Sequence, residues 1–297
     1  MLMILNIICI ILVVLLVFFV VESIREHNRF YTKEYDVSGH NIPASFDNTS
    51  FVVIADWHNA TYGPDNNRFI TKVKELQPDY ILIAGDMIVC SPHTQTKIKQ
   101  TADLLKQLST IAPVYYGYGN HEYGVREQLH NTRGLWDIYI KALDLETNSN
   151  IHMLDNKRMI IKRGSDKLCI SGLTLDKSFF KRFYTKPLES SYVKQICYED
   201  NAYNVVLAHN PDYFSTYADA GADLVLAGHN HGGMIRLPLF GGVISPRFHL
   251  FPKFDRGKYV KNATTMILSG GLGTHSIPLR VNNVPELLLV RLHNTTK

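Results

Sequence analysis

The sequence has few cysteines, and their spacing excludes two ways of stabilising a small domain. Only 4 of the 297 residues are cysteine, and no two of them are separated by two residues, as in a zinc knuckle. One lies in the apolar N-terminal run, which leaves an odd number elsewhere. We therefore expect neither a disulfide framework nor a structural zinc site, and we interpret the four as free thiols: Cys9, Cys90, Cys169 and Cys197.

The sequence also lacks an excess of charge of one sign. It has 31 Lys and Arg against 27 Asp and Glu, a formal net charge of +4, and the basic residues are dispersed. Because nucleic-acid-binding proteins usually gather basic residues on one face, no nucleic-acid partner is indicated. Internal repeats and low-complexity segments are missing outside the N-terminal run, which argues against a repeat protein.

What is present begins with a long apolar run. Residues 1–21 are apolar except for Asn6, and at about 1.5 Å per residue such a run can cross a hydrocarbon core of about 30 Å. No basic segment precedes it and no small-residue cleavage site lies before Glu22, so we expect an uncleaved transmembrane anchor at residues 1–22. Arg25, Arg29 and Lys33 follow the run, which favours a single-pass protein facing the cytoplasm; the opposite orientation is the alternative.

The rest of the chain predicts an α/β domain at residues 51–293, after a polar juxtamembrane segment at residues 23–50. Short β-branched runs alternate with segments whose apolar residues have helical spacing, a pattern typical of βαβ units. A hairpin follows at residues 158–173. The expected strands are residues 51–55, 80–84, 114–118, 204–208, 223–227, 264–269 and 286–292, and the expected helices are residues 68–76, 96–108 and 126–143. Two sheets flanked by helices are the natural packing of this order.

Residue types that bind metals follow these strands. Function in open α/β sheets concentrates at the carboxyl ends of parallel strands. Asp56 and His58 stand two residues apart, so both can project to one side. The pair His229 and His231 lies between glycines that allow close backbone approach. The five groups are Asp56-Trp57-His58, Gly85-Asp86, Gly119-Asn120-His121-Glu122, His209 and Gly228-His229-Asn230-His231.

Each group alone also fits an ordinary structural role. An Asp-x-His pair can be a helix cap beside a solvated histidine, and a Gly-Asp pair often marks a turn. The His-x-His pair between glycines is harder to explain by packing. Seven carboxylate, amide and imidazole side chains at one sheet edge therefore predict a two-metal hydrolase.

In this order, the five groups resemble the motifs of the calcineurin-like metallophosphoesterase superfamily over residues 51–292. The resemblance implies a four-layer αββα sandwich with a dinuclear site at the strand ends. Its two divalent ions, Mn, Fe or Zn, would share a hydroxide that attacks the phosphoryl group. The implied ligands are Asp56, His58 and His231 for the first ion, Asp86 as the bridge, and Asn120, His209 and His229 for the second.

The resemblance also implies roles beyond metal binding. His121 would act as general acid or contact the phosphoryl oxygens without binding a metal. Asn120, Asn59 and Arg280 are candidate substrate contacts, and His275 could contact a phosphate or headgroup. Many relatives carry an Asp three residues after the bridging Asp, where it orients the catalytic His, but this chain has Val89. Glu122 or Asp65 could substitute; otherwise leaving groups of low pKa are favoured.

The C-terminal part resembles the membrane-anchored phosphodiesterase branch, which is related to UDP-2,3-diacylglucosamine pyrophosphatases. The matching segments are Gly232–Ile235, Phe254–Tyr259 and Ser269–Thr274. The expected activity is hydrolysis of a phosphodiester or pyrophosphate, with a lipid-linked phosphoester as a candidate substrate. A phosphomonoesterase or protein phosphatase of the same fold, and a metal-binding membrane scaffold with weak turnover, are the alternatives.

Overall fold

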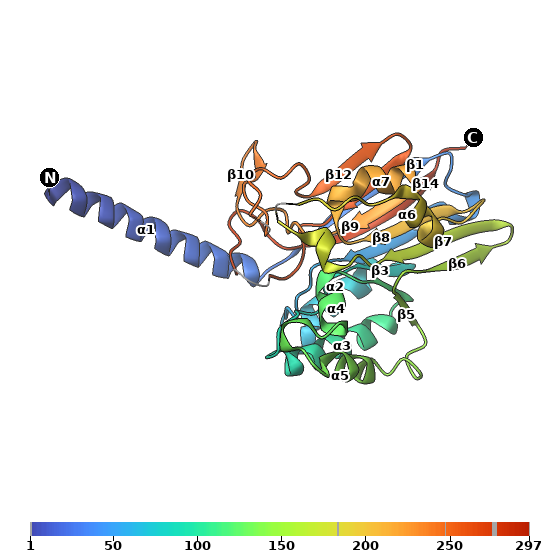
Figure 1. Cartoon of the computed structure of the whole chain (residues 1–297), viewed down its shortest axis with the longest axis horizontal. Coiled ribbons are helices and arrows are strands. Elements are labelled where there is room, and N and C mark those ends of the chain that lie inside the picture. Colours follow the sequence, from blue (N-terminus) through green and yellow to red (C-terminus); the bar gives the residue numbers. More distant parts are fainter. Residues whose placement is uncertain (1, 183, 247, 275–277, 297) are drawn as a thin grey trace.

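A computed structural model describes residues 2–182, 184–246, 248–274 and 278–296, and it contains two six-stranded sheets packed face to face (Figure 1). The first sheet has the spatial order β1 (Tyr31–Gly39), β14 (Glu286–Asn294), β2 (Ser50–Ile54), β3 (Tyr80–Ala84), β4 (Val114–Gly117) and β5 (Ile151–Leu154). The second has the order β12 (Gly257–Lys261), β13 (Thr264–Leu268), β9 (Leu224–Ala227), β8 (Tyr203–Ala208), β7 (Asp166–Leu173) and β6 (Lys157–Arg163).

Strand β2 illustrates how the layers are held together. Phe51 and Val53 are buried between the two sheets, whereas Val52 and Ile54 are buried beneath the outer helices of the first sheet. Successive side chains point to opposite faces, so a continuous apolar strand buries both of its faces. The helices over the first sheet are α2 (Asn67–Leu76), α3 (Gln95–Ser109) and α5 (Leu135–Leu143), and those over the second are α6 (Ser190–Cys197) and α7 (Phe214–Asp219). The expected four-layer αββα sandwich is therefore confirmed.

Two segments differ from the expected elements. The sequence predicts one helix at residues 126–143, and the first half of this prediction is wrong. Helix α4 (Asn120–Arg126) ends at Arg126, and α5 begins only at Leu135. Gln128, His130 and Gly134 have φ of 56°, 53° and 75°, so the backbone between them cannot continue a right-handed helix. Residues 31–39, expected within the juxtamembrane segment, form β1 and pair in parallel with β14.

Short elements complete the chain. The hairpin expected at residues 158–173 is the antiparallel pair of β6 and β7. The remaining elements are η1 (Ala44–Phe46), η2 (Pro64–Asn66), η3 (Leu129–Asn131), η4 (Lys177–Phe180), η5 (Pro211–Tyr213), β10 (Arg236–Leu237) and β11 (Gly241–Gly242).

Helix α1 (Leu2–His27) extends away from the domain (Figure 1) and is long and apolar enough to cross a membrane. Its last turns contact the C-terminal part of the domain. Ser23 Oγ donates to Pro278 O at 3.0 Å and accepts from Arg280 N at 3.0 Å, and Asn283 N donates to Glu26 Oε2 at 2.8 Å. The end of the candidate membrane helix is thus part of the folded domain.

Parallel strands bring distant loops to one edge of the sandwich. In the first sheet β2, β3 and β4 are parallel, and in the second β7, β8, β9 and β13 are parallel. The carboxyl ends of parallel neighbours meet at the same edge. The loops after these strands carry all five polar groups identified in the sequence.

Candidate metal centre

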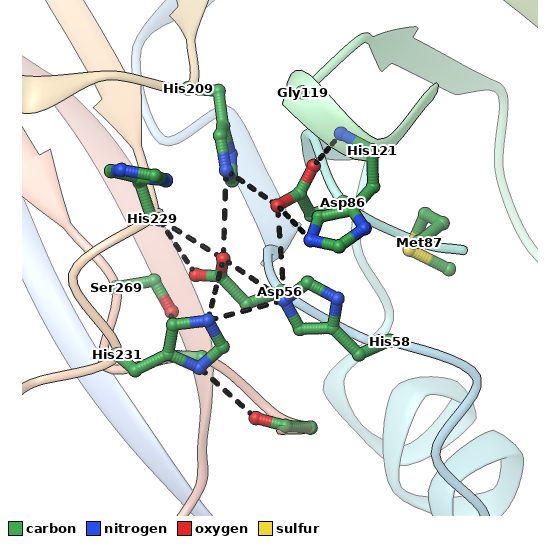
Figure 2. Close-up of polar contacts among 12 residues, drawn as sticks. Asp56, His58, Asp86, Met87, Gly119, His121, His209, His229, His231 and Ser269 are labelled. Carbon is green, nitrogen blue, oxygen red and sulfur yellow. Dashed lines mark hydrogen bonds and ion pairs between the residues drawn. The ribbon is translucent and has the colours of Figure 1, made fainter. Parts of the chain in front are cut away.

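Two groups of buried candidate ligands meet at this edge of the sandwich (Figure 2). The ligand atoms of Asp56, His58 and His231 lie within 4.8 Å of one another, as do those of Asp86, His209 and His229. An overlapping group joins His58 and Asp86 to His121. The structure therefore brings together all six acidic and imidazole residues that the sequence predicts as ligands.

The two carboxylates connect these groups. Asp86 Oδ2 lies 3.0 Å from His209 Nε2 and 3.8 Å from His58 Nε2, so it faces both groups. Asp56 Oδ1 lies 3.3 Å from His231 Nε2, and the Asp56 carboxylate also accepts from His229 N at 3.0 Å. Asp86 is thus placed as a bridging ligand would be, while Asp56 belongs mainly to the first group.

Backbone carbonyls determine which nitrogen of two histidines faces inward. His209 Nδ1 lies 2.7 Å from Ala84 O, and His231 Nδ1 lies 3.1 Å from Gly273 O. A carbonyl only accepts, so both Nδ1 atoms carry hydrogen and, in the neutral ring, each Nε2 has a lone pair. The Nε2 atoms of His58 and His231 face each other at 3.1 Å, an arrangement that a cation or a proton between them stabilises. Carbonyl-held imidazoles of this kind are typical metal ligands.

The backbone of the centre is unusual. Five of the predicted ligands have φ between 48° and 75°, a region that non-glycine residues rarely adopt and that clusters at functional sites: Asp56, His58, Asp86, His229 and His231. Gly85, with φ of 89°, allows this packing, because a Cβ there would lie 2.7 Å from both Gly119 N and His209 Nδ1. Tight loops, rather than regular strand geometry, therefore orient these five side chains.

Burial and pairing set the charges of the centre. Burial raises the pKa of Asp56 to about 6 and lowers the pKa of His58 to about 4, because a buried charge is poorly solvated. Burial also opposes charge on His209, but the nearby Asp86 carboxylate prevails and raises the pKa of His209 to about 10. For Asp86, burial acts in the opposite direction to His209, and the imidazolium holds the pKa of Asp86 well below its usual range. The buried carboxylates need a positive charge beside them, and a divalent ion can supply it.

Asn120 adds an oxygen donor to this set. It is the first residue of α4, and its buried Oδ1 has no hydrogen-bond partner among the described residues. A buried amide oxygen without a partner is costly, and a cation would relieve that cost. Carboxylate, amide and imidazole donors together are typical of sites for divalent transition metals. The residues present therefore fit the two ions that the resemblance implies.

His121 has the opposite hydrogen-bond arrangement. Its Nδ1 accepts from Cys90 N at 2.8 Å, so in the neutral ring Nε2 carries the hydrogen. That Nε2 lies 4.0 Å from Asp86 Oδ2. Burial lowers the pKa of His121 to about 4, although the Asp86 carboxylate acts to raise it. This arrangement presents a donor, whereas a metal ligand needs a lone pair.

Glu122 holds the turn that carries Asp86. Its Oε2 accepts from Asp86 N and Gly119 N at 2.8 Å, and its Oε1 accepts from Met87 N at 2.7 Å. Ile88 N and the Tyr116 hydroxyl add two further donors to Oε1. Glu122 thus fixes the backbone around Asp86, whereas Cys90 N donates the hydrogen bond to His121 Nδ1. Asp65 lines a separate pocket with Gln100 and Gln107.

Arg280 lies inside the protein, with 1% of its surface exposed. Its guanidinium donates to the carbonyl oxygens of Gly270, Gly271, Gly273 and Asn283. Gly273 O is also the partner of His231 Nδ1. This burial contradicts the expected contact between Arg280 and substrate, since both terminal nitrogens are occupied by the loop. Arg280 instead positions the loop behind His231.

The other expected substrate contacts have different outcomes. Asn59 is buried, and its Oδ1 accepts from Thr101 Oγ1 of α3 at 3.0 Å, so its side chain faces the core and a substrate contact is not supported. Asn120 lines a pocket together with His121 and His229. His275 lies outside the described residues.

Lys177 and Phe180, which line one side of that pocket, were not identified from the sequence. The pocket has a volume of ≈ 370 Å³, and besides Asn120, His121 and His229 it is lined by Cys90, Gly124, Leu129, His130, Lys177 and Phe180. Lys177 Nζ lies 2.9 Å from His130 Nε2. Lys177 and Phe180 belong to η4, which follows the carboxyl end of β7. The strand-end rule would have found them had β7 been recognised as a parallel neighbour of β8.

Comparison with known proteins agrees with this geometry. The sequence pattern of the family described as calcineurin-like phosphoesterase matches residues 49–233. The uncharacterized metallophosphoesterase YkuE of Bacillus subtilis is 27% identical over 91% of this chain and 88% of its own length. Phosphodiesterase YaeI of Escherichia coli is 27% identical over 73% of this chain and 72% of its own length.

The name of a third relative describes it as a transmembrane protein. The transmembrane protein with metallophosphoesterase domain of Bos taurus is 25% identical over 85% of this chain, which spans 54% of that relative. The family pattern covers more than half of the present chain. The protein therefore belongs to the calcineurin-like phosphoesterases and is a hydrolase that acts on phosphoric esters.

Proposed function

We propose that this protein hydrolyses a phosphodiester or pyrophosphate bond with two divalent ions, Mn, Fe or Zn. The observation that carries the proposal is the ≈ 370 Å³ pocket beside Asn120, His121 and His229, which continues to Lys177 and Phe180. A pocket of this size has room for a substituent beyond the phosphoryl group. The Lys177 ammonium favours a substrate that carries a second negatively charged group, because a cation at this position attracts a further phosphate.

The proposed ligand roles follow the two groups of side chains. Asp56, His58 and His231 would hold one ion, His209, His229 and Asn120 would hold the other, and Asp86 would serve both. When bound, the ions would supply positive charge beside the phosphoryl oxygens and lower the pKa of a water held between them. The surrounding carbonyls of Ala84 and Gly273 keep His209 and His231 in the tautomer that binds metal.

The proposed role of His121 is to donate a hydrogen bond from Nε2 to a phosphoryl oxygen. The support is its contact with Cys90 N, which donates to Nδ1 at 2.8 Å. An imidazolium would have to give up that bond, because both of its nitrogens are donors. A neutral donor stabilises negative charge but transfers no proton to the leaving group. Substrates with leaving groups of low pKa, such as pyrophosphates and aryl esters, suit this arrangement.

His121→Ala is expected to keep both metals and to slow turnover on the order of 10²-fold, since one preorganised donor is lost. The measurement is hydrolysis of two aryl phosphodiesters with different leaving-group pKa values, together with metal content by mass spectrometry. As a neutral donor, His121 predicts similar losses for both esters. His40→Ala, an exposed histidine, is the matched control. A much larger loss for the poorer leaving group would show that His121 is a general acid, and loss of metal would make it a ligand.

The function itself is tested with the full chain in detergent, stripped of metal and then supplied with Mn²⁺. The full chain is needed because β1 and the end of α1 belong to the folded domain. We expect Mn²⁺-dependent hydrolysis of bis(p-nitrophenyl) phosphate to exceed that of p-nitrophenyl phosphate. A preference for the monoester would favour a phosphatase of the same fold. Stoichiometric metal binding without turnover on either ester would favour a membrane scaffold.

The proposal extends to a substrate at the membrane. Glu26, in the last turn of α1, accepts from Asn283 N, and the Asn283 amide donates to His231 O at 2.7 Å. The end of the candidate span is thus two hydrogen bonds from a proposed metal ligand, which supports a lipid-linked phosphoester as substrate. Arg25, Arg29 and Lys33 follow the apolar run of residues 1–21, and we therefore propose that the catalytic domain faces the cytoplasm.

A further inference from the structure

Six large apolar side chains are exposed in one short segment of the domain. We call them the apolar patch: Leu237, Leu239, Phe240, Phe248, Leu250 and Phe251. Leu239 is fully exposed, and Phe240 is 73% exposed. Elsewhere in the described part of the domain, such side chains occur singly or as one neighbouring pair: Tyr31, Met159, Ile160, Tyr184, Tyr192 and Val260. A concentration of this kind on a soluble surface marks an interaction site.

The segment that carries the patch is folded. Phe251 N donates to Val243 O at 2.8 Å, and Ile244 and Leu250 form an antiparallel bridge. The Asp255 carboxylate accepts from Gly242 N and from Arg236, at 2.8 and 2.9 Å. Because hydrogen bonds hold this backbone in place, the apolar side chains point outward as part of the native structure and cannot simply turn into the core.

Backbone angles give the same indication. Leu239, Phe248 and Phe251 have φ of 71°, 60° and 47°. Bulky residues rarely adopt this region, and the strain persists only where the surrounding structure imposes it. Three strained apolar residues that face outward need a compensating environment.

The patch is joined to the end of α1 through a few backbone contacts. Arg236 N donates to Val281 O at 3.0 Å, and Val281 N donates to Met234 O at 3.1 Å. Two residues further along, Asn283 N donates to Glu26 Oε2. Figure 1 shows β10 and its loops on the side of the domain from which α1 leaves. The patch therefore lies near the level at which the sequence of α1 changes from apolar to charged, at Glu22.

Basic residues flank the patch. The Arg182 guanidinium lies over the Phe248 ring, 4.6 Å from its centroid, and Lys253 Nζ lies 5.1 Å from the centroid of Phe254. Phe and Leu beside Arg and Lys are the composition of segments that insert at a membrane interface, where the rings enter the acyl region and the cations meet anionic headgroups.

We propose that the apolar patch inserts into the interface of the same bilayer that α1 spans, and that anionic lipid is its partner. The continuity with α1, the outward-facing aromatic rings and the flanking cations favour lipid over a second protein. The patch segment begins a few residues after His231, so this contact sets the metal centre close to the bilayer surface. The proposal rests on α1 crossing a membrane and does not depend on which phosphoester is hydrolysed.

The test places a tryptophan in the patch of the full chain, in nanodiscs that contain phosphatidylglycerol and a phosphatidylcholine brominated on its acyl chains. Leu239→Trp and Phe240→Trp both replace exposed side chains, so neither disturbs the core. Val260→Trp, on β12 and 63% exposed, is the matched control far from the carboxyl ends of the strands. Wild-type fluorescence from Trp57 and Trp136 gives the background.

We expect bromination to reduce the additional emission of Leu239→Trp and Phe240→Trp about twofold, because bromine on the acyl chains quenches a ring that inserts to that depth. Val260→Trp should be unaffected. Nanodiscs with unbrominated phosphatidylcholine provide the reference. If bromination changed the emission of none of the three variants, the proposal would be overturned. If the patch tryptophans are not quenched but their emission shifts with protein concentration, the patch contacts a second copy of the chain, and the lipid proposal is also wrong.

Discussion

Asp86→Asn is expected to lower metal content and hydrolysis together, with activity falling on the order of 10³-fold. Asp86 Oδ2 faces His209 Nε2 at 3.0 Å and His58 Nε2 at 3.8 Å, so one oxygen serves both groups of ligands. The amide keeps the shape of the side chain but removes the charge that binds two cations in a buried site. Its nitrogen would also face imidazole nitrogens that should face metal.

Metal content per chain by mass spectrometry and hydrolysis of bis(p-nitrophenyl) phosphate are the measurements. Asp103→Asn is the matched control: its side chain is 60% exposed on α3, where it pairs with Lys106. This control should retain both metals and full activity. If Asp86→Asn kept two metals per chain while losing activity, Asp86 would not be the bridge. Full metal content together with full activity would place the reaction elsewhere.

The clustering of the candidate ligands could be predicted because the signal is local. Asp56, Asp86 and His209 each follow a short apolar run within two residues, and a buried parallel strand ends where its apolar run ends. Parallel pairing then brings these ends to one edge without further information from the sequence. The four-layer fold could be predicted for the same reason, since continuous apolar strands need cover on both faces.

The states of the histidines could not be predicted, because they depend on contacts between distant segments. His209 Nδ1 meets a carbonyl 125 residues away, and His231 Nδ1 meets one 42 residues away. The burial of Arg280 has the same origin, since the loop that it binds is positioned by β13 and by the end of α1. Charged residues near glycines in sequence do not reveal which of them become enclosed.

Strand β1 was missed for a different physical reason. Residues 31–39 alternate in exposure and contain Lys33, Glu34 and Asp36, as edge strands commonly do to discourage pairing with other chains. A charged edge strand and a polar linker look alike in composition. Only its parallel register with β14 distinguishes them. Residues 31–39 therefore belong to the first sheet, although their composition resembles that of a linker.

Helix α1, the candidate membrane span, is connected to the candidate metal centre through hydrogen bonds. Asn283 joins Glu26 of α1 to the backbone of His231, and Arg280 joins Ser23 to the loop behind the same histidine. A helix that served only as a tether would not need buried hydrogen bonds to the catalytic loops. Helix α1 therefore contributes to the shape of the candidate metal centre.

Glu122→Gln is expected to destabilise the domain by about 3 kcal/mol and to weaken metal binding. Both carboxylate oxygens accept from backbone N–H groups: Oε2 from Asp86 and Gly119, and Oε1 from Met87 and Ile88. An amide has one oxygen, so in either orientation its NH₂ group meets two backbone donors. These N–H groups are buried and would lose their acceptor. The turn that presents Asp86 would then have to move.

Guanidinium unfolding of the full chain in detergent, followed by tryptophan fluorescence, measures the change in stability. Glu127→Gln is the control, because that carboxylate is 45% exposed and pairs with Arg126 at the surface, where such pairs contribute little. Tyr116→Phe removes one donor to Glu122 without adding a clash, so it should cost less than Glu122→Gln. An unchanged midpoint for Glu122→Gln would mean that strand packing alone holds Asp86. A large decrease in the midpoint with unchanged metal content would mean that Glu122 stabilises this turn but does not determine how Asp86 binds metal.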